Sequence, residues 1–348
     1  MSADGDGAPR ARPVTLADIA RAAGTSASTA SRAINGKGYV SESARARLLA
    51  AADQLGYVPN ASARTLKQQT SRVVGVVVSD LGNQFYGRLS AAIEQTLREA
   101  DYQMVLVGDN SENAEELAAV RTFLAMRAPG VIMTPVGADA CALMSRHGLS
   151  VVEVDRRLAR EECDAVVIDN ERGARDATAH LLDAGHRRVA LLVAATNWTS
   201  DVGRLAGYRQ AHEEAGLPLD ERLIVRVAFH EPDAERLIGD LLEHEQPTAI
   251  FAANNLLAEQ AWRVLRQRGL RLPDDISLVG FDDVPWMEMV SPGMTVVAQP
   301  TEELGRRAAQ LLLRRIADPD CLHTVERLQP TLVVRGSTGP PNQAGQAV

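Results

Sequence analysis

From residue 72 onwards the chain alternates short apolar, β-branched runs with amphipathic helical patterns, and few folds accommodate that alternation. The nine runs include Val73–Val78, Val151–Val154 and Ile276–Val279, and most of the gaps hold one helical segment such as Arg172–Ala184. Strands that are apolar throughout and separated by single helices form parallel sheets with helices on both faces. Nine strands exceed one sheet of ordinary size. We therefore expect a body of two α/β lobes.

Residues 14–57 follow a different pattern, that of three short helices. In "VTLADIARAAG" apolar residues recur at i, i+3, i+4 and i+7 from Leu16, behind a capping-box-like start at Thr15. The segment "SESARARLLAAADQLGY" predicts a longer helix that begins after Ser41 and ends at Gly56. Between them, Ser26 is a suitable N-cap for a short helix that follows a tight turn. Helix, tight turn and helix together form a helix-turn-helix.

The short central helix has an unusual composition, "TSASTASRAINGK" at residues 25–37. Six of its first eight residues are Ser, Thr or Arg, and no large apolar side chain occurs before Ile34. Small hydroxyl residues let a helix backbone approach base edges in the major groove, while hydroxyls and N-terminal amides bind phosphates. Arg32 and Lys37 add positive charge at the groove edge. The alternative, a small-residue helix packed tightly in a core, fits so many polar residues poorly.

The net charge of −8 conceals an uneven distribution. Residues 1–70 contain nine Lys or Arg against five Asp or Glu, a balance of +4. The remaining residues contain 28 against 40, a balance of −12. A small basic head on a large acidic body predicts a polyanionic partner for the head alone.

Other features argue against several classes of protein. The N-terminus does not resemble a signal peptide, and the longest apolar runs are far shorter than a membrane span. The scattered cysteines Cys141, Cys163 and Cys321 fit reduced thiols in the cytoplasm, and neither disulfides nor a zinc site. The sequence lacks a GxGxxG after a strand, a P-loop, HExxH, CxxC and GxSxG. We therefore expect that the protein is not an enzyme and that it binds neither a metal ion nor a cofactor.

The stretch from Val14 to Lys67 resembles, without a gap, the head of the LacI/GalR family of bacterial transcription regulators. The family pattern "VSxxTVSRVLN" corresponds to "TSASTASRAIN" in this chain. By that resemblance Ala27 and Ser28 occupy positions that choose bases, and Arg32 is among those that grip phosphates or base edges. The residues expected to contact DNA in this head are Thr15, Ser26, Ala27, Ser28, Thr29, Ser31, Arg32, Asn35, Lys37 and Tyr39.

The next stretch, "YVPNASARTLK" at residues 57–67, resembles the hinge of the same family. Residues 60–66 span fewer than two helical turns, too few for a stable isolated helix. In the family this hinge folds on the operator beside its dimer mate, and Leu66 aligns with the apolar wedge that enters the minor groove. Asn60, Ala63 and Leu66 therefore complete the expected DNA contacts. A plain interdomain linker is the alternative.

The body, residues 72–337, resembles the type I periplasmic-binding-protein fold that the family uses to sense effectors. The resemblance implies two lobes that close on a small ligand, with the chain crossing between them three times. We expect a disordered tail (1–12), a helix-turn-helix domain (13–58), a hinge and linker (59–70), a two-lobed effector-binding and dimerisation domain (71–337) and a flexible tail (338–348). Lobe 1 is expected at about 71–158 plus 299–322, and lobe 2 at about 159–298 plus 323–337.

Effector-binding side chains are expected at the carboxyl ends of the strands, where loops from both lobes meet. Asp282 and Arg204 suit the hydroxyl groups of a sugar, and aromatic rings suit its C–H faces. Asp155 and Arg156 could instead form a local ion pair. The expected effector-binding residues are Asn83, Phe85, Tyr86, Asp155, Arg156, Trp198, Arg204, Phe229, Asn254, Asp282 and Gln299.

Together these features predict a cytoplasmic, homodimeric repressor that binds a near-palindromic operator in double-stranded DNA. A small-molecule effector, expected by the resemblance to be a sugar or sugar derivative, would control its operator affinity. The expected fold is an all-α helix-turn-helix DNA-binding head plus an α/β two-lobed, periplasmic-binding-protein-like (type I) effector domain. The alternatives are a sugar-active enzyme, a ligand-binding protein on the same body and a sequence-independent architectural DNA binder. The C-terminus has no heptads, so no coiled-coil tetramer is expected.

Overall fold

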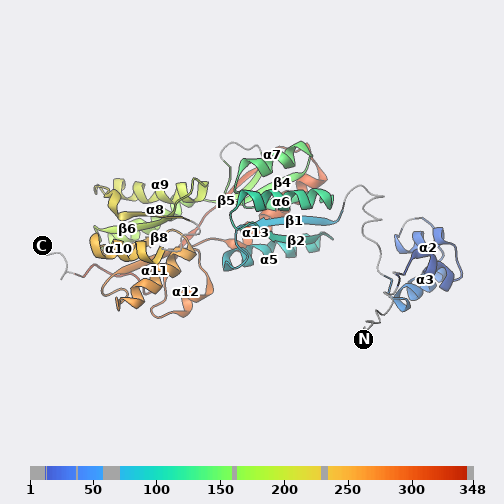
Figure 1. Ribbon diagram of the computed structural model, residues 1–348, viewed down its shortest axis with the longest axis horizontal. Helices are drawn as coiled ribbons and strands as arrows, with labels where there is room; N and C mark the ends of the chain where they lie inside the picture. Colours follow the sequence, from blue (N-terminus) through green and yellow to red (C-terminus); the bar gives the residue numbers. More distant parts are fainter. Residues whose placement is uncertain are drawn as a thin grey trace, which may run out of the picture. The chain divides into compact units, whose positions relative to one another are not determined.

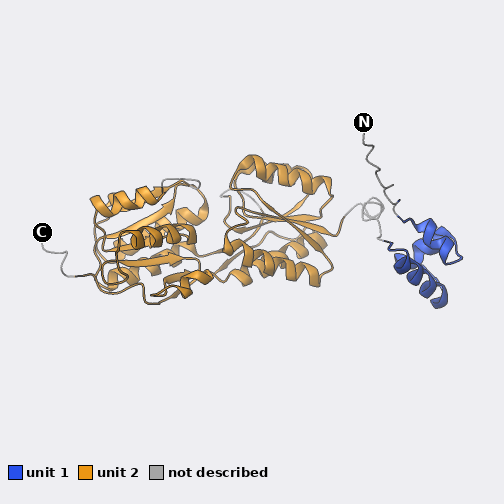
Figure 2. Ribbon diagram, turned by 60° about the horizontal axis from the view of Figure 1, so that its bottom comes forward, with its two compact units in different colours: residues 1–69 blue, residues 70–348 orange. Residues whose placement is uncertain are grey.

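The computed structural model describes residues 12, 14–36, 38–57, 71–158, 163–228 and 234–342. It divides into two compact units, residues 1–69 and 70–348, which are described separately (Figure 2). Five of the residues singled out from the sequence lie outside the described ranges. They are Lys37, Asn60, Ala63, Leu66 and Phe229.

The first unit contains the three expected helices, α1 (Leu16–Ala22), α2 (Ala27–Ile34) and α3 (Glu42–Gln54). The Thr15 amide donates to the Asp18 carboxylate at 2.9 Å, and the Asp18 amide donates back to the Thr15 hydroxyl at 3.4 Å, so the capping box is present. Ser26 caps α2 and Ser41 caps α3. The helices enclose a small core around Ile19 and Leu48. The predicted helix-turn-helix is confirmed.

The second unit contains two six-stranded sheets, each between layers of helices (Figure 1). The first sheet has the order β11-β5-β4-β3-β1-β2, and all its strand pairs are parallel. Its strands are β1 (Val73–Val78), β2 (Gln103–Gly108), β3 (Gly130–Met133), β4 (Ser150–Asp155), β5 (Asp164–Ile168) and β11 (Val325–Leu328).

The second sheet has the order β12-β10-β9-β8-β6-β7, and only its edge strand β12 runs antiparallel to its neighbour. Its strands are β6 (Val189–Ala194), β7 (Ile224–Val227), β8 (Ala249–Ala252), β9 (Ser277–Phe281), β10 (Thr295–Ala298) and β12 (Thr331–Val333). The two-lobed α/β body expected from the alternating pattern is therefore confirmed.

Helices cover both faces of each sheet, as continuous apolar strands require. In β1 the side chains of Val76 and Val78 join one core, whereas that of Val77 joins another on the opposite face. Around the first sheet lie α5 (Gln84–Glu99), α6 (Asn113–Ala125), α7 (Ala138–Arg146) and α13 (Thr301–Ala317). The second lobe contains α8 (Asn170–Asp183), α9 (Thr199–Glu214), η1 (Glu221–Leu223), α10 (Ala234–His244), α11 (Asn255–Gln267) and α12 (Pro285–Met289). Within the described ranges, none of the helices has the length and apolar character that would let it cross a bilayer.

The expected lobe boundaries near 158 and 322 require correction. Strands β5 and β11 follow those boundaries, yet both pair within the first sheet. Asp164, fully buried at the start of β5, accepts hydrogen bonds from Arg315 Nε at 2.9 Å and from the Thr324 amide at 2.7 Å. These partners are more than 150 residues distant in sequence, so local pattern could not assign β5 to a sheet. The first lobe thus extends to Ile168 and includes β11.

Helices α8 and α9 pack unusually closely because of one glycine. A Cβ atom at Gly207 in α9 would lie 2.0 Å from the carbonyl oxygen of Glu171 and 2.7 Å from the amide nitrogen of Arg175, both in α8. No rotamer change relieves a clash with backbone atoms. Gly207 therefore sets the distance between these two helices.

We predict that Gly207→Ala lowers the free energy of unfolding by about 1–3 kcal/mol, because the added methyl group overpacks the interface between two helices. Urea or guanidinium denaturation measures the loss. The control is Gly87→Ala in the exposed part of α5, where a Cβ atom meets nothing within 4 Å. There the better helix propensity of Ala is expected to stabilise by about 0.5–1 kcal/mol. Equal effects of the two substitutions would contradict the packing argument.

Candidate functional site

The N-terminus of α2 presents a cluster of hydroxyl groups. The Ser26 hydroxyl accepts a hydrogen bond from the Thr29 amide at 3.2 Å and shares hydrogen bonds with the hydroxyls of Ser28 at 2.9 Å and Thr29 at 2.8 Å. Ala27 and Ser28 are exposed, whereas Ala30 and Ala33 are buried against α1 and α3. The helix is thus packed on one side only, and its hydroxyl-bearing side faces solvent.

Two larger polar side chains extend this exposed side toward the end of α2. Arg32 Nε donates to the Ser28 carbonyl at 3.3 Å, and the side chain lies close to Gly38, where a Cβ atom would be 3.2 Å from Arg32 Cδ. Asn35 Nδ2 donates to the Ser31 carbonyl at 2.8 Å. Among the described residues Arg32 has no ion-pair partner, so its guanidinium remains available to a phosphate.

The other expected DNA-contacting residues differ in their surroundings. The Thr15 hydroxyl donates to Asp18 at 2.6 Å within the capping box, and this hydrogen bond is the first cause of the lowered pKa of Asp18. Tyr39 is 90% exposed. Every DNA contact expected in the head remains a prediction: those of Thr15, Ser26, Ala27, Ser28, Thr29, Ser31, Arg32, Asn35 and Tyr39, and those of Lys37 and the three hinge residues, which lie outside the described ranges.

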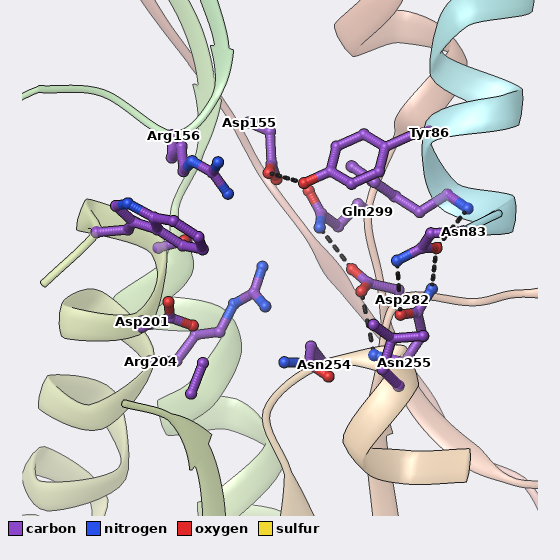
Figure 3. Close-up of a pocket in the computed structure, with 15 residues that line it drawn as sticks. Asn83, Tyr86, Asp155, Arg156, Asp201, Arg204, Asn254, Asn255, Asp282 and Gln299 are labelled. Carbon is purple, nitrogen blue, oxygen red and sulfur yellow. Dashed lines mark hydrogen bonds between the residues drawn. The ribbon is translucent and has the colours of Figure 1, made fainter. Parts of the chain in front are cut away.

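In the second unit one pocket lies where the carboxyl ends of strands from both sheets meet (Figure 3). Ten of the eleven expected effector-binding residues line it, and the eleventh, Phe229, lies outside the described residues. The ten are Asn83, Phe85, Tyr86, Asp155, Arg156, Trp198, Arg204, Asn254, Asp282 and Gln299. Side chains more than two hundred residues apart in sequence, such as those of Asn83 and Gln299, thus meet in one pocket.

Two aspartates occupy similar backbone positions at the ends of strands. Asp155 ends β4 with φ 70°, and Asp282 follows β9 with φ 71°. A positive φ is uncommon for residues other than glycine and is concentrated at functional sites. The Tyr86 hydroxyl donates to Asp155 at 3.2 Å, and Gln299 Nε2 donates to Asp282 at 2.6 Å. Burial raises the pKa of Asp155, although Arg204 and Arg156 act in the opposite direction.

Two buried arginines face these aspartates and are held by neutral groups. Arg156 donates to the Pro135 carbonyl and the Ser79 hydroxyl, each at 2.7 Å, and its guanidinium lies 3.5 Å from the centre of the Trp198 ring. Arg204 donates to Asn170 Oδ1 at 2.9 Å and to the Ala253 carbonyl at 2.6 Å, with its guanidinium 3.8 Å from the centre of the Phe281 ring. Aromatic faces stabilise buried cations without neutralising them.

The suggested ion pair between Asp155 and Arg156 does not form; no ion pair joins them among the described residues. Trp198 was expected to stack on a ligand, but one face of its ring is covered by Arg156. The stacking role of Trp198 is thus limited to the ring's other face or edge.

The pocket also contains residues that the strand-end rule did not identify. Asn255, at the start of α11, exchanges two hydrogen bonds with Asn83 across the lobes, at 3.1 and 2.6 Å. Asp201 lies in the first turn of α9, is 5% exposed, and accepts a hydrogen bond from the Thr196 hydroxyl. Burial raises the pKa of Asp201. The lining residues that were missed are Ala194, Ser200, Asp201, Asn255 and Leu256.

A signal for these residues existed in the sequence. Asn255 follows the expected Asn254 directly, and Ser200 and Asp201 lie one helical turn before the expected Arg204. Residues one turn before a ligand-binding helical residue share its face of the helix. Across the described chain, no group of His, Cys, Asp and Glu side chains is arranged to hold a metal ion. The pocket instead combines carboxylates, amides, guanidiniums and aromatic rings, groups that bind hydroxyls and apolar ring faces.

Two protein-family models match this chain, one in each of its two compact units. Residues 15–60 match the model described as "Bacterial regulatory proteins, lacI family", and residues 178–338 match the model described as "Periplasmic binding protein-like domain". The first match covers the three helices of the first unit, and the second covers most of the second lobe together with α13.

Similar proteins extend over nearly the whole chain. The HTH-type transcriptional regulator DegA of Bacillus subtilis (strain 168) is 34% identical over 94% of this chain and 99% of its own length. The HTH-type transcriptional repressor PurR of Vibrio atlanticus (strain LGP32) is 30% identical over 93% of this chain and 98% of its own length.

Solved structures agree with these relatives. The lac repressor dimer bound to operator and the anti-inducer ONPF has a TM-score of 0.82 at 28% identity and covers 94% of this chain and 100% of its own. The complex of the transcriptional regulator CelR with cellobiose has a TM-score of 0.71 at 33% identity, with the same coverage. The chain therefore belongs to the lacI family of bacterial regulatory proteins, and it is a DNA-binding transcriptional regulator rather than an enzyme.

Proposed function

We propose that this protein is a cytoplasmic repressor that binds a near-palindromic operator in double-stranded DNA as a homodimer. A sugar or sugar derivative, bound between the two lobes, controls its operator affinity. The observation that carries the DNA-binding part is the one-sided packing of α2, which leaves its hydroxyls and Arg32 exposed while Ala30 and Ala33 are buried. Relatives of nearly full length are regulators and repressors, which supports the same assignment.

In the proposed complex α2 lies in the major groove. The exposed Ala27 methyl and Ser28 hydroxyl meet base edges, and Arg32 and the hydroxyl cluster at Ser26 bind backbone phosphates. A homodimer presents two such helices to two half-sites, so a near-palindrome matches its two-fold symmetry. Leu66 of the hinge, outside the described residues, is proposed to wedge into the minor groove at the centre of the operator.

In the proposed effector site, hydroxyl groups of the ligand pair with the strand-end aspartates and with the two arginines. The pocket receives side chains from both lobes, so a ligand there contacts both and favours one lobe arrangement over another. Such a difference in affinity between two states is what couples effector and operator binding. The similar CelR structure contains cellobiose, and a similar LacI-family regulator from Enterococcus faecium contains ribose, which supports a sugar here.

We predict that Arg32→Ala weakens binding to the operator and to unrelated DNA alike, because a phosphate contact carries no sequence information. The slope of log affinity against log salt is expected to fall by about one unit. Fluorescence anisotropy with labelled duplexes over a salt series measures both effects. The control is Arg21→Ala, which removes the same charge from α1, where Arg21 pairs with Asp18 at 3.2 Å. An unchanged slope for Arg32→Ala would remove the phosphate role.

We predict that Asp282→Ala abolishes the effector response and leaves operator binding intact, because Asp282 lines the pocket and belongs to the second unit. A thermal-shift screen of sugars, nucleosides and small acids first identifies a ligand of the wild-type protein. Operator binding with and without that ligand then measures the response. Asp283→Ala is the control, since this neighbour pairs with Arg335 at 2.8 Å and does not line the pocket. A normal response in Asp282→Ala refutes the assigned site.

A further inference from the structure

The effector pocket contains five buried charges that do not pair with one another. Asp155, Asp201 and Asp282 are 5–7% exposed, and Arg156 and Arg204 are 3–4% exposed. Among the described residues, no ion pair within 4.0 Å joins any of these carboxylates to either guanidinium. Buried charges are normally paired, because an unpaired charge in a protein interior is strongly destabilising. Five such charges around one pocket therefore indicate that their partner is a ligand.

The hydrogen bonds already formed by these groups show what remains for that ligand. Nε and Nη2 of Arg156 are engaged with protein atoms, as are Nε and Nη1 of Arg204, which leaves one terminal nitrogen of each guanidinium. Asp155 and Asp201 each accept one side-chain hydrogen bond on Oδ2, which leaves Oδ1. Gln299 Oε1 is buried and has no hydrogen-bond partner within the described structure. The pocket thus offers both donors and acceptors.

A hydroxyl group on a ligand can pair with both the donors and the acceptors of the pocket, since it donates one hydrogen bond and accepts others. Placed between a guanidinium and a carboxylate, it accepts from the first and donates to the second. A phosphate or carboxylate only accepts; it would pair with Arg156 or Arg204 but would face three carboxylates at short range. Like charges at such short range repel each other more strongly in a partly buried site than in water.

We propose that the pocket selects an uncharged, hydroxyl-rich effector and that Asp201 is the residue that excludes anionic ones, such as phosphorylated or acidic sugars. The inference rests on the proposed effector function of this pocket. The charges of Asp155 and Asp282 alone would balance those of Arg156 and Arg204. Asp201 adds the third carboxylate and makes the pocket net negative.

Asp201 could serve α9 rather than a ligand, because acidic residues stabilise the first turn of a helix. The two roles predict opposite effects of removing the charge. Asp201→Asn keeps the shape and an acceptor for the Thr196 hydroxyl. If the carboxylate serves the ligand, its loss relieves an unpaired buried charge and raises the melting temperature of the protein alone. If it serves the helix, the melting temperature falls.

The sign of the pH dependence follows from burial, which raises the pKa of Asp201 in the folded protein. Ionised Asp201 therefore destabilises the fold at pH values above its folded pKa, and the penalty vanishes below the ordinary pKa of an aspartate. The gain in melting temperature of Asp201→Asn over the wild type is expected at pH 8 and should disappear toward pH 4. Differential scanning fluorimetry of the 348-residue chain across this pH range measures the gain.

Ligand selectivity is tested with matched pairs: glucose against glucose 6-phosphate and glucuronate, and ribose against ribose 5-phosphate. Titration calorimetry of the wild-type protein is expected to show the uncharged member of a bound pair binding at least about tenfold more tightly than its anionic partner. In Asp201→Asn that ratio should fall by about tenfold. Asp183→Asn is the control. This substitution removes the same charge from an exposed residue of the same lobe that does not line the pocket.

Two results would overturn the proposal. One is a phosphorylated or acidic sugar that binds the wild-type protein at least as tightly as its uncharged partner. The other is a lower melting temperature for Asp201→Asn at pH 8, which decides the matter even if none of the sugars binds. Footprinting of operator DNA by the wild-type protein tests the proposed function separately. Protection of an operator together with a preference for anions would refute the charge inference alone.

Discussion

The regulatory body of this protein is organised around charges that are buried where the carboxyl ends of the parallel strands of two sheets meet. Parallel strands direct their carboxyl ends to one edge, and both lobes turn that edge toward the same pocket. Trp198 and Phe281 cover the guanidiniums of Arg156 and Arg204 there, and backbone carbonyls accept hydrogen bonds from both arginines. The aromatic rings therefore hold the two guanidiniums in place without forming an ion pair with them, so both remain able to bind a ligand.

The positions of several pocket side chains depend on pairs of helices whose backbones pack in direct contact. In the second lobe Gly207 lets α9 approach α8, and in the first lobe a Cβ atom at Gly305 of α13 would lie 2.5 Å from the Leu89 carbonyl oxygen of α5. Gly207 lies in α9, which carries the pocket residue Arg204, and Gly305 packs against α5, which carries the pocket residue Tyr86. Close helix packing thus fixes pocket side chains that the strands alone do not position.

Sequence reasoning succeeded where the determining interactions are local. The head could be predicted because capping by Thr15, Ser26 and Ser41 acts within four residues. Ten pocket residues followed from a topological rule about strand ends and a family resemblance. Asp201 was missed because it reaches the pocket from the first turn of α9 and not from the end of a strand. The lobe boundary was misplaced because the contacts of Asp164 with Arg315 and Thr324 are long-range.

The two lobes are also joined by bonds in which no ligand takes part. Asn83 and Asn255 exchange hydrogen bonds of 3.1 and 2.6 Å, and Arg88 donates to the Asp283 carbonyl at 2.9 Å. Each such bond contributes a net free energy of about 1 kcal/mol, and coupling between an effector and a second site typically amounts to about 1–3 kcal/mol. The two quantities are of similar size. A ligand that bridges unpaired charges on both lobes can therefore shift the equilibrium between lobe arrangements. The hydrogen bonds between the lobes contribute a free energy that is neither much larger nor much smaller than that of the ligand.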